Sequence, residues 1–117
     1  MKALLTLLAI SLASLSFSQD WKEGIVFSTA TITEDYCVQL DADNPVQEWY
    51  EMDITHLGFA SQDEANKAFW SRANNLVSYN VDLSENKAYA RVHLDRTPEP
   101  KDINWWNDYL NSLCPTE

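Results

Sequence analysis

The sequence VSYNVDLSENKAYARVHL, residues 77–94, decides the fold predicted for this chain. Apolar and polar residues alternate on both sides of a central SENK segment, which has the composition of a tight turn. Such alternation is typical of a strand with one buried and one solvated face. The segment therefore predicts a β-hairpin with strands at 76–83 and 88–94. Its apolar side should carry Val77, Tyr79, Val81, Leu83, Ala88, Ala90, Val92 and Leu94.

Two helices are predicted, one on each side of this hairpin. Upstream, Ser61 and Glu64 form a capping-box pattern, in which each side chain bonds a backbone amide at the start of a helix. Apolar residues follow at helical spacing up to Leu76. Downstream, apolar residues mark one face of a final helix, which Pro115 should end. That face carries Ile103, Trp106, Leu110 and Leu113.

The remaining strands are predicted at residues 24–33, 36–40 and 48–57. From residue 36 the order is β-β-α-β-β-α, which predicts an α+β fold of the ferredoxin-like, permuted α/β plait type. The right-handed crossover rule places strand 48–57 centrally, with strand 88–94 antiparallel beside it. Strand 36–40 should flank its other side, giving an antiparallel sheet with two helices on one face and the other face open. Residues 24–33 should add an edge strand or cover one end.

Residues 1–18 resemble a secretory signal peptide. A lysine near the start is followed by an apolar stretch of about 13 residues, and small residues, Ser16 and Ser18, precede the expected cleavage site. A membrane anchor is the alternative, but crossing a bilayer needs roughly 20 apolar residues. We expect cleavage near Ser18 and Gln19, which leaves a secreted or periplasmic single α+β domain over residues 19–117.

The composition restricts the partners open to this chain. Its 117 residues carry a formal net charge of −10, which argues against nucleic acid and anionic membranes. Only two glycines are present, so Gly-rich phosphate loops are excluded, and no cofactor is expected. Residues 19–64 hold 11 acids and one base. This acidic half indicates a basic protein or another cationic ligand as the partner.

Cys37 and Cys114 are the only cysteines. Export to an oxidising compartment would allow them to form a disulfide. A redox role is not indicated, because the sequence has no C-x-x-C motif. The predicted fold brings the end of the last helix near the start of strand 36–40, as the bond requires. Two free thiols are the alternative.

Residues 58–95 resemble a heavy-metal-associated, ferredoxin-like domain. That family opens its first helix with a Gly-Met-x-Cys-x-x-Cys loop and later has a V-x-V-D-L-E-N-K hairpin. Here GFASQDE at residues 58–64 occupies the loop, and VSYNVDLSENK at residues 77–87 occupies the hairpin. The two metal thiolates would fall on Ser61 and Glu64, and neither is a soft ligand for copper(I). The resemblance therefore implies the fold, and it does not imply soft-metal transfer.

The sequence contains few of the motifs that mark catalytic and metal-binding sites. The sequence contains no nucleophile elbow and no H-E-x-x-H, so we expect no catalysis, with a minor hydrolase as the alternative. Asp41 and Asp43 begin like a calcium loop, but Pro45 and Val46 stand where an EF-hand needs a ligand and a glycine. Asp41 and Asp43 remain candidates for a looser carboxylate site, and a polar hairpin loop is the alternative.

The open sheet face is the main binding candidate. Alternation predicts that it presents Glu51, Asp53, Tyr89, Arg91 and His93. Antiparallel pairing should set Arg91 against Glu51 or Asp53. Tyrosine and arginine are common on binding surfaces. A solvated face without a function is the alternative.

The leading functional hypothesis is an exported, non-catalytic binding or interaction module for a cationic partner. A periplasmic metal or small-ligand carrier is the second hypothesis, which the family resemblance suggests. Three of the five tryptophans, Trp49, Trp70 and Trp105, lie off the predicted core faces and should either pack in part or anchor a partner. The oligomeric state stays open.

Overall fold

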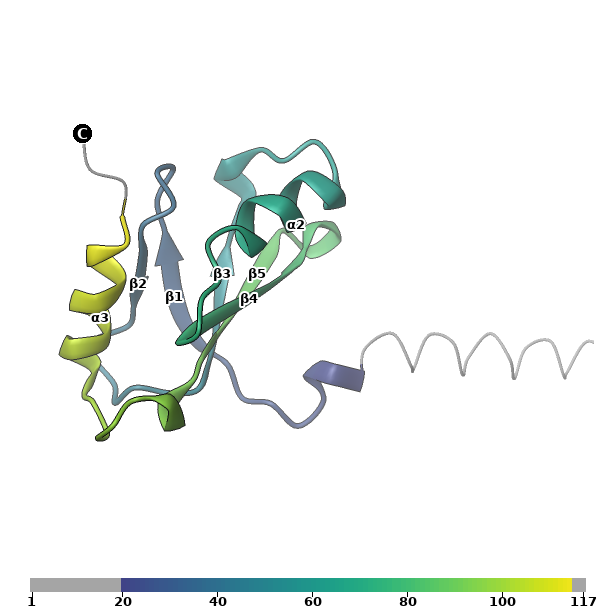
Figure 1. The fold of residues 1–117 in the computed structure, drawn as a ribbon. Helices are drawn as coiled ribbons and strands as arrows, with labels where there is room; N and C mark the ends of the chain where they lie inside the picture. The colour runs from purple at the N-terminus through teal and green to yellow at the C-terminus, as the bar shows by residue number, and fades with distance from the viewer. Residues whose placement is uncertain (1–19, 115–117) are drawn as a thin grey trace, which may run out of the picture.

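The computed structural model describes residues 20–114, so the predicted signal peptide lies outside the described residues. Within this range the fold is α+β, as predicted (Figure 1). No helix in this range is long and apolar enough to cross a membrane. The strands and α-helices are β1 (Ser28–Ile32), β2 (Val38–Leu40), β3 (Trp49–Asp53), α2 (Gln62–Trp70), β4 (Val77–Asp82), β5 (Lys87–Val92) and α3 (Ile103–Ser112).

The predicted hairpin is confirmed as β4 and β5. Its antiparallel register runs from Val77 opposite Val92 to Asp82 opposite Lys87. A short 3₁₀ helix, η3 (Leu83–Glu85), forms the turn and ends at Asn86, whose φ of 54° is left-handed. Asparagine tolerates this conformation better than most residues do. The other side of β5 pairs antiparallel with β3, also as predicted.

The predicted position of the first two strands is wrong. The five strands lie in the order β2-β1-β3-β5-β4, so β1 is an inner strand and β2 is the edge strand. Because β1 runs parallel to β3, the sheet is mixed and the ferredoxin-like strand order is not confirmed. The reason is local: β1 and β2 are separated by a short turn and pair with each other as a hairpin.

This turn has an unusual residue at its critical position. Thr33 N donates to the Cys37 carbonyl at 3.0 Å, and Tyr36 N donates to the Thr33 carbonyl at 2.9 Å. Tyr36 has a φ of 65°. Three-residue hairpin loops end in such a left-handed residue, which is usually glycine or asparagine. Because tyrosine is rare at this position, the sequence does not indicate a hairpin turn here.

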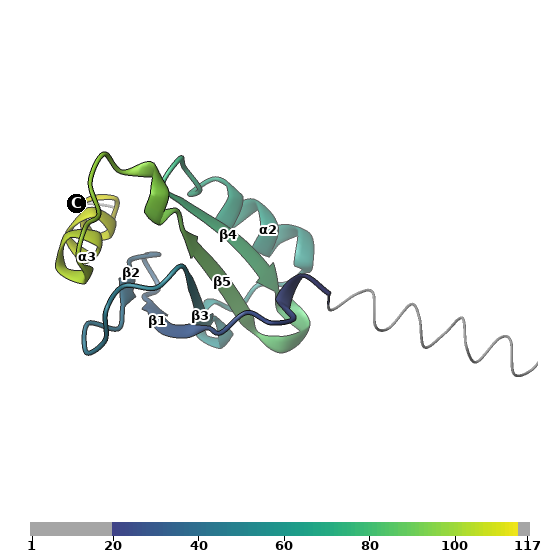
Figure 2. The same ribbon diagram turned by 90° about the horizontal axis from the view of Figure 1, so that it is seen from below.

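Both helices lie on the same face of the sheet, as predicted. Phe69 of α2 and Trp106 and Leu110 of α3 join one buried core with alternate residues of all five strands. On this face α2 packs beside β4 and α3 beside β2, at the two opposite edges of the sheet (Figure 2). The strand residues of this core are Ala30, Ile32, Val38, Leu40, Tyr50, Met52, Val77, Tyr79, Ala88, Ala90 and Val92.

The start of each helix is capped by a side chain. Ser61 Oγ accepts a hydrogen bond from Glu64 N at 3.1 Å, as the capping box predicts. Glu64 Oε2 accepts a hydrogen bond from the amide of Ala60, at 3.4 Å, whereas the capping box would use the next amide, that of Ser61. Asp102 caps α3 by accepting from Trp105 N at 2.8 Å. Such caps typically contribute about 1 kcal/mol each.

The disulfide between Cys37 and Cys114 is confirmed, with a Cα–Cα distance of 5.1 Å. It joins the start of β2 to the end of α3. In the same region Asn107 of α3 hydrogen-bonds both backbone polar groups of Leu40, at 2.8 and 3.1 Å. Helix α3 therefore covers the edge strand, which would otherwise leave unpaired backbone groups.

Candidate functional site

The outer face of the sheet, opposite the helices, is partly covered by the chain that precedes β1. Figure 2 shows this segment running across the sheet to the β4–β5 hairpin. Trp21 and Phe27 pack on Tyr89, with ring centroids at 5.3 and 5.0 Å, and both also contact Trp49, at 5.6 and 5.9 Å. We call these four residues the outer aromatic cluster. Tyr89 is only 4% exposed, so its predicted place on an open face is wrong.

Lys22 fastens this segment to the hairpin. Its Nζ donates to Glu85 Oε1 at 2.8 Å and to the Tyr89 hydroxyl at 3.1 Å, and it lies 4.8 Å from the Tyr89 ring centroid. Burial alone would lower the pKa of Lys22, but the hydrogen bonds to Glu85 and Tyr89 outweigh it and raise the pKa to about 12. The ammonium group is therefore held in its charged form.

His93 is also buried, at 9% exposure, against the prediction of an open-face residue. It follows the last residue of β5, where the chain enters a short 3₁₀ helix, η4 (Leu94–Arg96). Its Nε2 lies 3.0 Å from Ser78 Oγ. Burial, with Arg96 and Arg91 nearby, lowers the pKa of His93. A buried, hydrogen-bonded histidine of this kind supports the fold.

Arg91 stays exposed on the outer face, but its predicted partners are wrong. In the observed register Arg91 lies opposite Trp49 on one side and Ser78 on the other. Its Nε donates to Glu48 Oε2 at 2.8 Å, and its guanidinium lies 5.4 Å from the Trp49 ring centroid. Glu51 faces Tyr89 instead. The side chain therefore borders the outer aromatic cluster.

The uncovered part of the outer face lies over β1. On one side Thr29 is paired with Glu51 of β3. On the other side the Thr29 carbonyl accepts a hydrogen bond from the backbone amide of Asp41, at 3.1 Å. Two hollows of about 430 and 530 Å³ meet here and share Thr29 and Thr31. One hollow is bordered by Glu51 and Asp53, and the other by Asp41 and Asp43. We call this surface the acidic trough, floored by Thr29 and Thr31 and bordered by these four carboxylates.

Two of these carboxylates are held in the charged form by local hydrogen bonds. Asp41 accepts from the Asp43 amide and from Asn44 Nδ2, both at 2.9 Å, and these bonds lower its pKa. Asp53 accepts from the Thr55 hydroxyl at 2.6 Å and the Thr55 amide at 2.9 Å, which lowers its pKa as well. The trough therefore keeps negative charge at pH values where an ordinary aspartate begins to be protonated.

One end of the trough also carries basic side chains. Lys87 lies opposite Asp53 in the β3–β5 register, and His56 borders the same hollow. His56 Nε2 lies 2.7 Å from the Ile32 carbonyl, so the imidazole is oriented by the backbone. The negative charge of the trough is consequently concentrated toward Asp41, Asp43 and Glu51.

Among residues 20–114, no three His, Cys, Asp or Glu side chains are grouped to hold a metal ion. Ser61 and Glu64, where the family resemblance would place ligands, form the cap of α2. Cys37 and Cys114 are joined in the disulfide.

The structure thus brings four predicted candidates together and separates the other three. Asp41, Asp43, Glu51 and Asp53 share the trough, whereas Tyr89 and His93 are buried and Arg91 pairs with Glu48. Comparisons with protein-family models, with curated proteins and with solved structures found no match for this chain.

Proposed function

We propose that the protein is an exported, non-catalytic binding module that holds a basic protein segment in the acidic trough. One observation carries this proposal. Insertion of β1 between β2 and β3 places Asp41 and Glu51 on either side of Thr29, on the same exposed face. Export rests on the signal-like residues 1–18, and a disulfide suits an oxidising compartment.

The spacing of the carboxylates favours an extended cationic partner. Asp41 and Glu51 lie two strand spacings apart, or roughly 10 Å. That separation is too wide for one metal ion, whose ligands lie at about 2–2.6 Å. Successive lysine or arginine side chains of a peptide could reach both carboxylates, and the threonine hydroxyls between them can accept or donate hydrogen bonds. The net charge of −10 would also accelerate association with a basic partner.

A lysine-rich peptide of about ten residues is a suitable probe, because each added charge should strengthen a largely electrostatic contact. Its binding is measured by NMR titration of the backbone amides at low and at high salt. We expect shifts centred on Thr29, Thr31 and Glu51, and weaker binding at high salt. The double variant Asp41→Asn with Glu51→Gln should weaken binding by about tenfold or more.

A matched control removes the same charge elsewhere. Asp95→Asn with Glu99→Gln changes two exposed acids outside the trough and should leave the affinity close to that of the parent protein. Equal losses in both double variants would mean that the peptide responds only to net charge. That result, or shifts spread evenly over the surface, would overturn the proposed site.

A further inference from the structure

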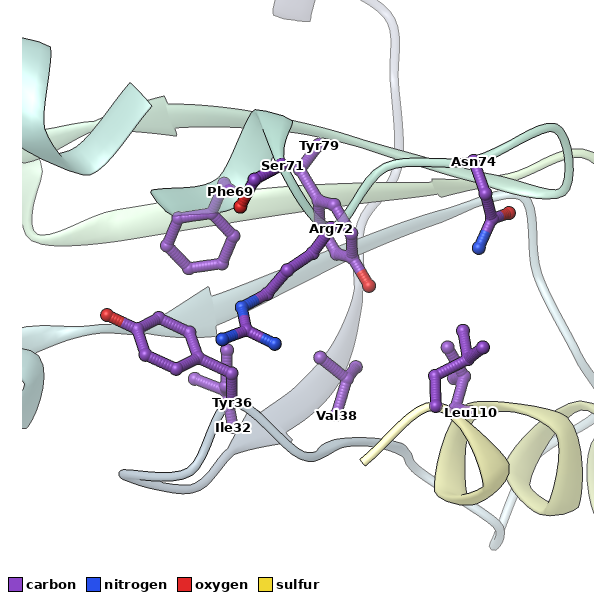
Figure 3. Close-up of a pocket in the computed structure, with 10 residues that line it drawn as sticks. Ile32, Tyr36, Val38, Phe69, Ser71, Arg72, Asn74, Tyr79 and Leu110 are labelled. Carbon is purple, nitrogen blue, oxygen red and sulfur yellow. The ribbon is translucent and has the colours of Figure 1, made fainter. Parts of the chain in front are cut away.

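A pocket of about 220 Å³ opens on the helix side of the sheet, away from the acidic trough (Figure 3). It lies between the end of α2 and the end of α3. Its apolar walls come from both helices and the first two strands, and they include Ile32, Val38, Phe69, Leu110 and Leu113. Leu113 is 46% exposed, so this side of the pocket is open to solvent.

One cationic side chain, that of Arg72, lines this pocket. The guanidinium carbon of Arg72 lies 4.2 Å from the centre of the Tyr36 ring, and Figure 3 shows the guanidinium directed into the space above Ile32. In the part of the chain that the structure describes, Arg72 forms no ion pair, as is also true of Lys87, Arg96 and Lys101.

Two further hydrogen-bond donors face the same space. Asn74 Oδ1 accepts from the amides of Leu76 and Val77, at 2.8 and 3.0 Å, which fixes the side chain and leaves its NH₂ group toward the pocket (Figure 3). The Tyr79 hydroxyl points into the pocket as well. Burial raises the pKa of Tyr79 from 10.0 to about 12, and at neutral pH the hydroxyl is protonated.

The backbone at Tyr36 supports a specific role for its ring. A left-handed tyrosine costs roughly 1–2 kcal/mol relative to glycine or asparagine at such a position. The conformation sets the ring beside Phe69, at 6.0 Å, and beneath Arg72. The ring thus holds the guanidinium in place at the pocket while leaving its N–H groups available.

We propose that this pocket binds a small organic monocarboxylate with an apolar body. One guanidinium matches one negative charge, and its planar fork of donors fits a carboxylate. The net charge of the chain opposes ligands with more negative charge. A cavity of about 150 Å³ accommodates benzene, so 220 Å³ has room for a ring and a carboxylate. The site is separate from the trough and does not depend on the proposed cationic partner.

Phenylacetate is the probe, and phenylacetamide is its neutral counterpart of the same shape. Binding is measured by NMR titration of the methyl groups of Ile32, Leu110 and Leu113 at roughly 1–10 mM ligand, the range expected for a small fragment. We expect phenylacetate to shift these signals in a saturable manner and phenylacetamide to bind at least about tenfold more weakly. Failure of phenylacetate to saturate them, or equal binding of both compounds, would overturn the proposal.

Two variants test the assignment to Arg72. Arg72→Gln removes the cation from an exposed side chain and should reduce phenylacetate affinity by about tenfold or more. Arg91→Gln makes the same change on the outer face and should leave the affinity unchanged. Circular dichroism verifies that both variants fold. An Arg72→Gln protein that is folded and binds as well as Arg91→Gln would exclude the guanidinium as the carboxylate contact.

Discussion

Lys22 and Glu85, 63 residues apart in sequence, are joined by a 2.8 Å hydrogen bond between Nζ and Oε1. Asp82 lies 3.8 Å from the same Nζ. The ion pair connects the segment before β1 to the β4–β5 hairpin, and it crosses directly over Tyr89. The Lys22 ammonium group therefore covers one side of the outer aromatic cluster.

Replacing Lys22 by methionine should loosen this covering segment. We expect a loss of about 0.5–1 kcal/mol in the free energy of unfolding, the range for a partly exposed ion pair. Trp21 and Trp49 should become more exposed to water, which red-shifts tryptophan fluorescence. Lys67→Met is the matched control, because both side chains of its pair with Asp63 are mostly exposed on the surface of α2. Equal spectra for the two variants would show that Lys22 does not hold the segment down.

Asn107→Ala should destabilise the edge of the sheet. The variant leaves the N–H and C=O of Leu40 without their side-chain partner, which costs about 1–3 kcal/mol for buried groups. Urea unfolding measures the loss, and hydrogen exchange of the Leu40 amide should become faster. Asn104→Ala, at an exposed position in the first turn of α3, should change neither quantity. Unchanged exchange at Leu40 in Asn107→Ala would contradict this role.

The sequence predicted those parts of the fold that depend on local pattern. The β4–β5 hairpin and the Ser61 cap follow from alternation and capping, and both are confirmed. Helical spacing predicted the core positions of Phe69, Trp106 and Leu110. It was wrong at the helix ends, because α2 ends at Trp70, before Leu76, and Leu113 follows α3 and is 46% exposed. The disulfide followed from having one possible pair of cysteines and from the expected place of the last helix.

The errors concern choices between distant segments. Tyr36 occupies a left-handed turn position that usually holds glycine or asparagine. Because neither residue is present, the sequence pattern does not indicate the β1–β2 hairpin. Consequently the sequence alone could not predict that Asp41 and Asp43 lie across β1 from Glu51 and Asp53. The burial of Tyr89 depends on Trp21 and Phe27, whose paths no local rule specifies. The density of aromatic residues near the start of the domain was the available signal for this cover.

Removing the disulfide should cost more than any single side-chain contact described above. Cys37 and Cys114 are separated by 77 positions, and a loop of this length corresponds to roughly 4–5 kcal/mol in the chain-entropy model. Urea unfolding with and without reductant should show a large decrease in the midpoint for the parent protein. The double variant Cys37→Ser with Cys114→Ser should be equally unstable and insensitive to reductant. Equal midpoints for the oxidised and reduced parent would contradict the prediction.

Stability should decline between about pH 10 and pH 12 because of Tyr79. Burial raises the pKa of Tyr79 from 10.0 to about 12, so in this range the unfolded chain releases a proton that the folded chain keeps. The unfolded state is then favoured by about 1.4 kcal/mol per pH unit for each such group. Lys22, with a folded pKa of about 12 against 10.5, shifts stability in the same direction. The contribution of each group is present below its unfolded pKa and is lost as the pH rises toward 12.

Tyr79→Phe isolates one proton of this linkage. Thermal unfolding of parent and variant between pH 8 and pH 12 should show a shallower decline for the variant, with the Lys22 component remaining. Absorbance of the tyrosinate form should meanwhile lose a component that titrates near pH 12. If both proteins lose stability with the same slope, burial in the folded state does not disfavour the ionised form of Tyr79.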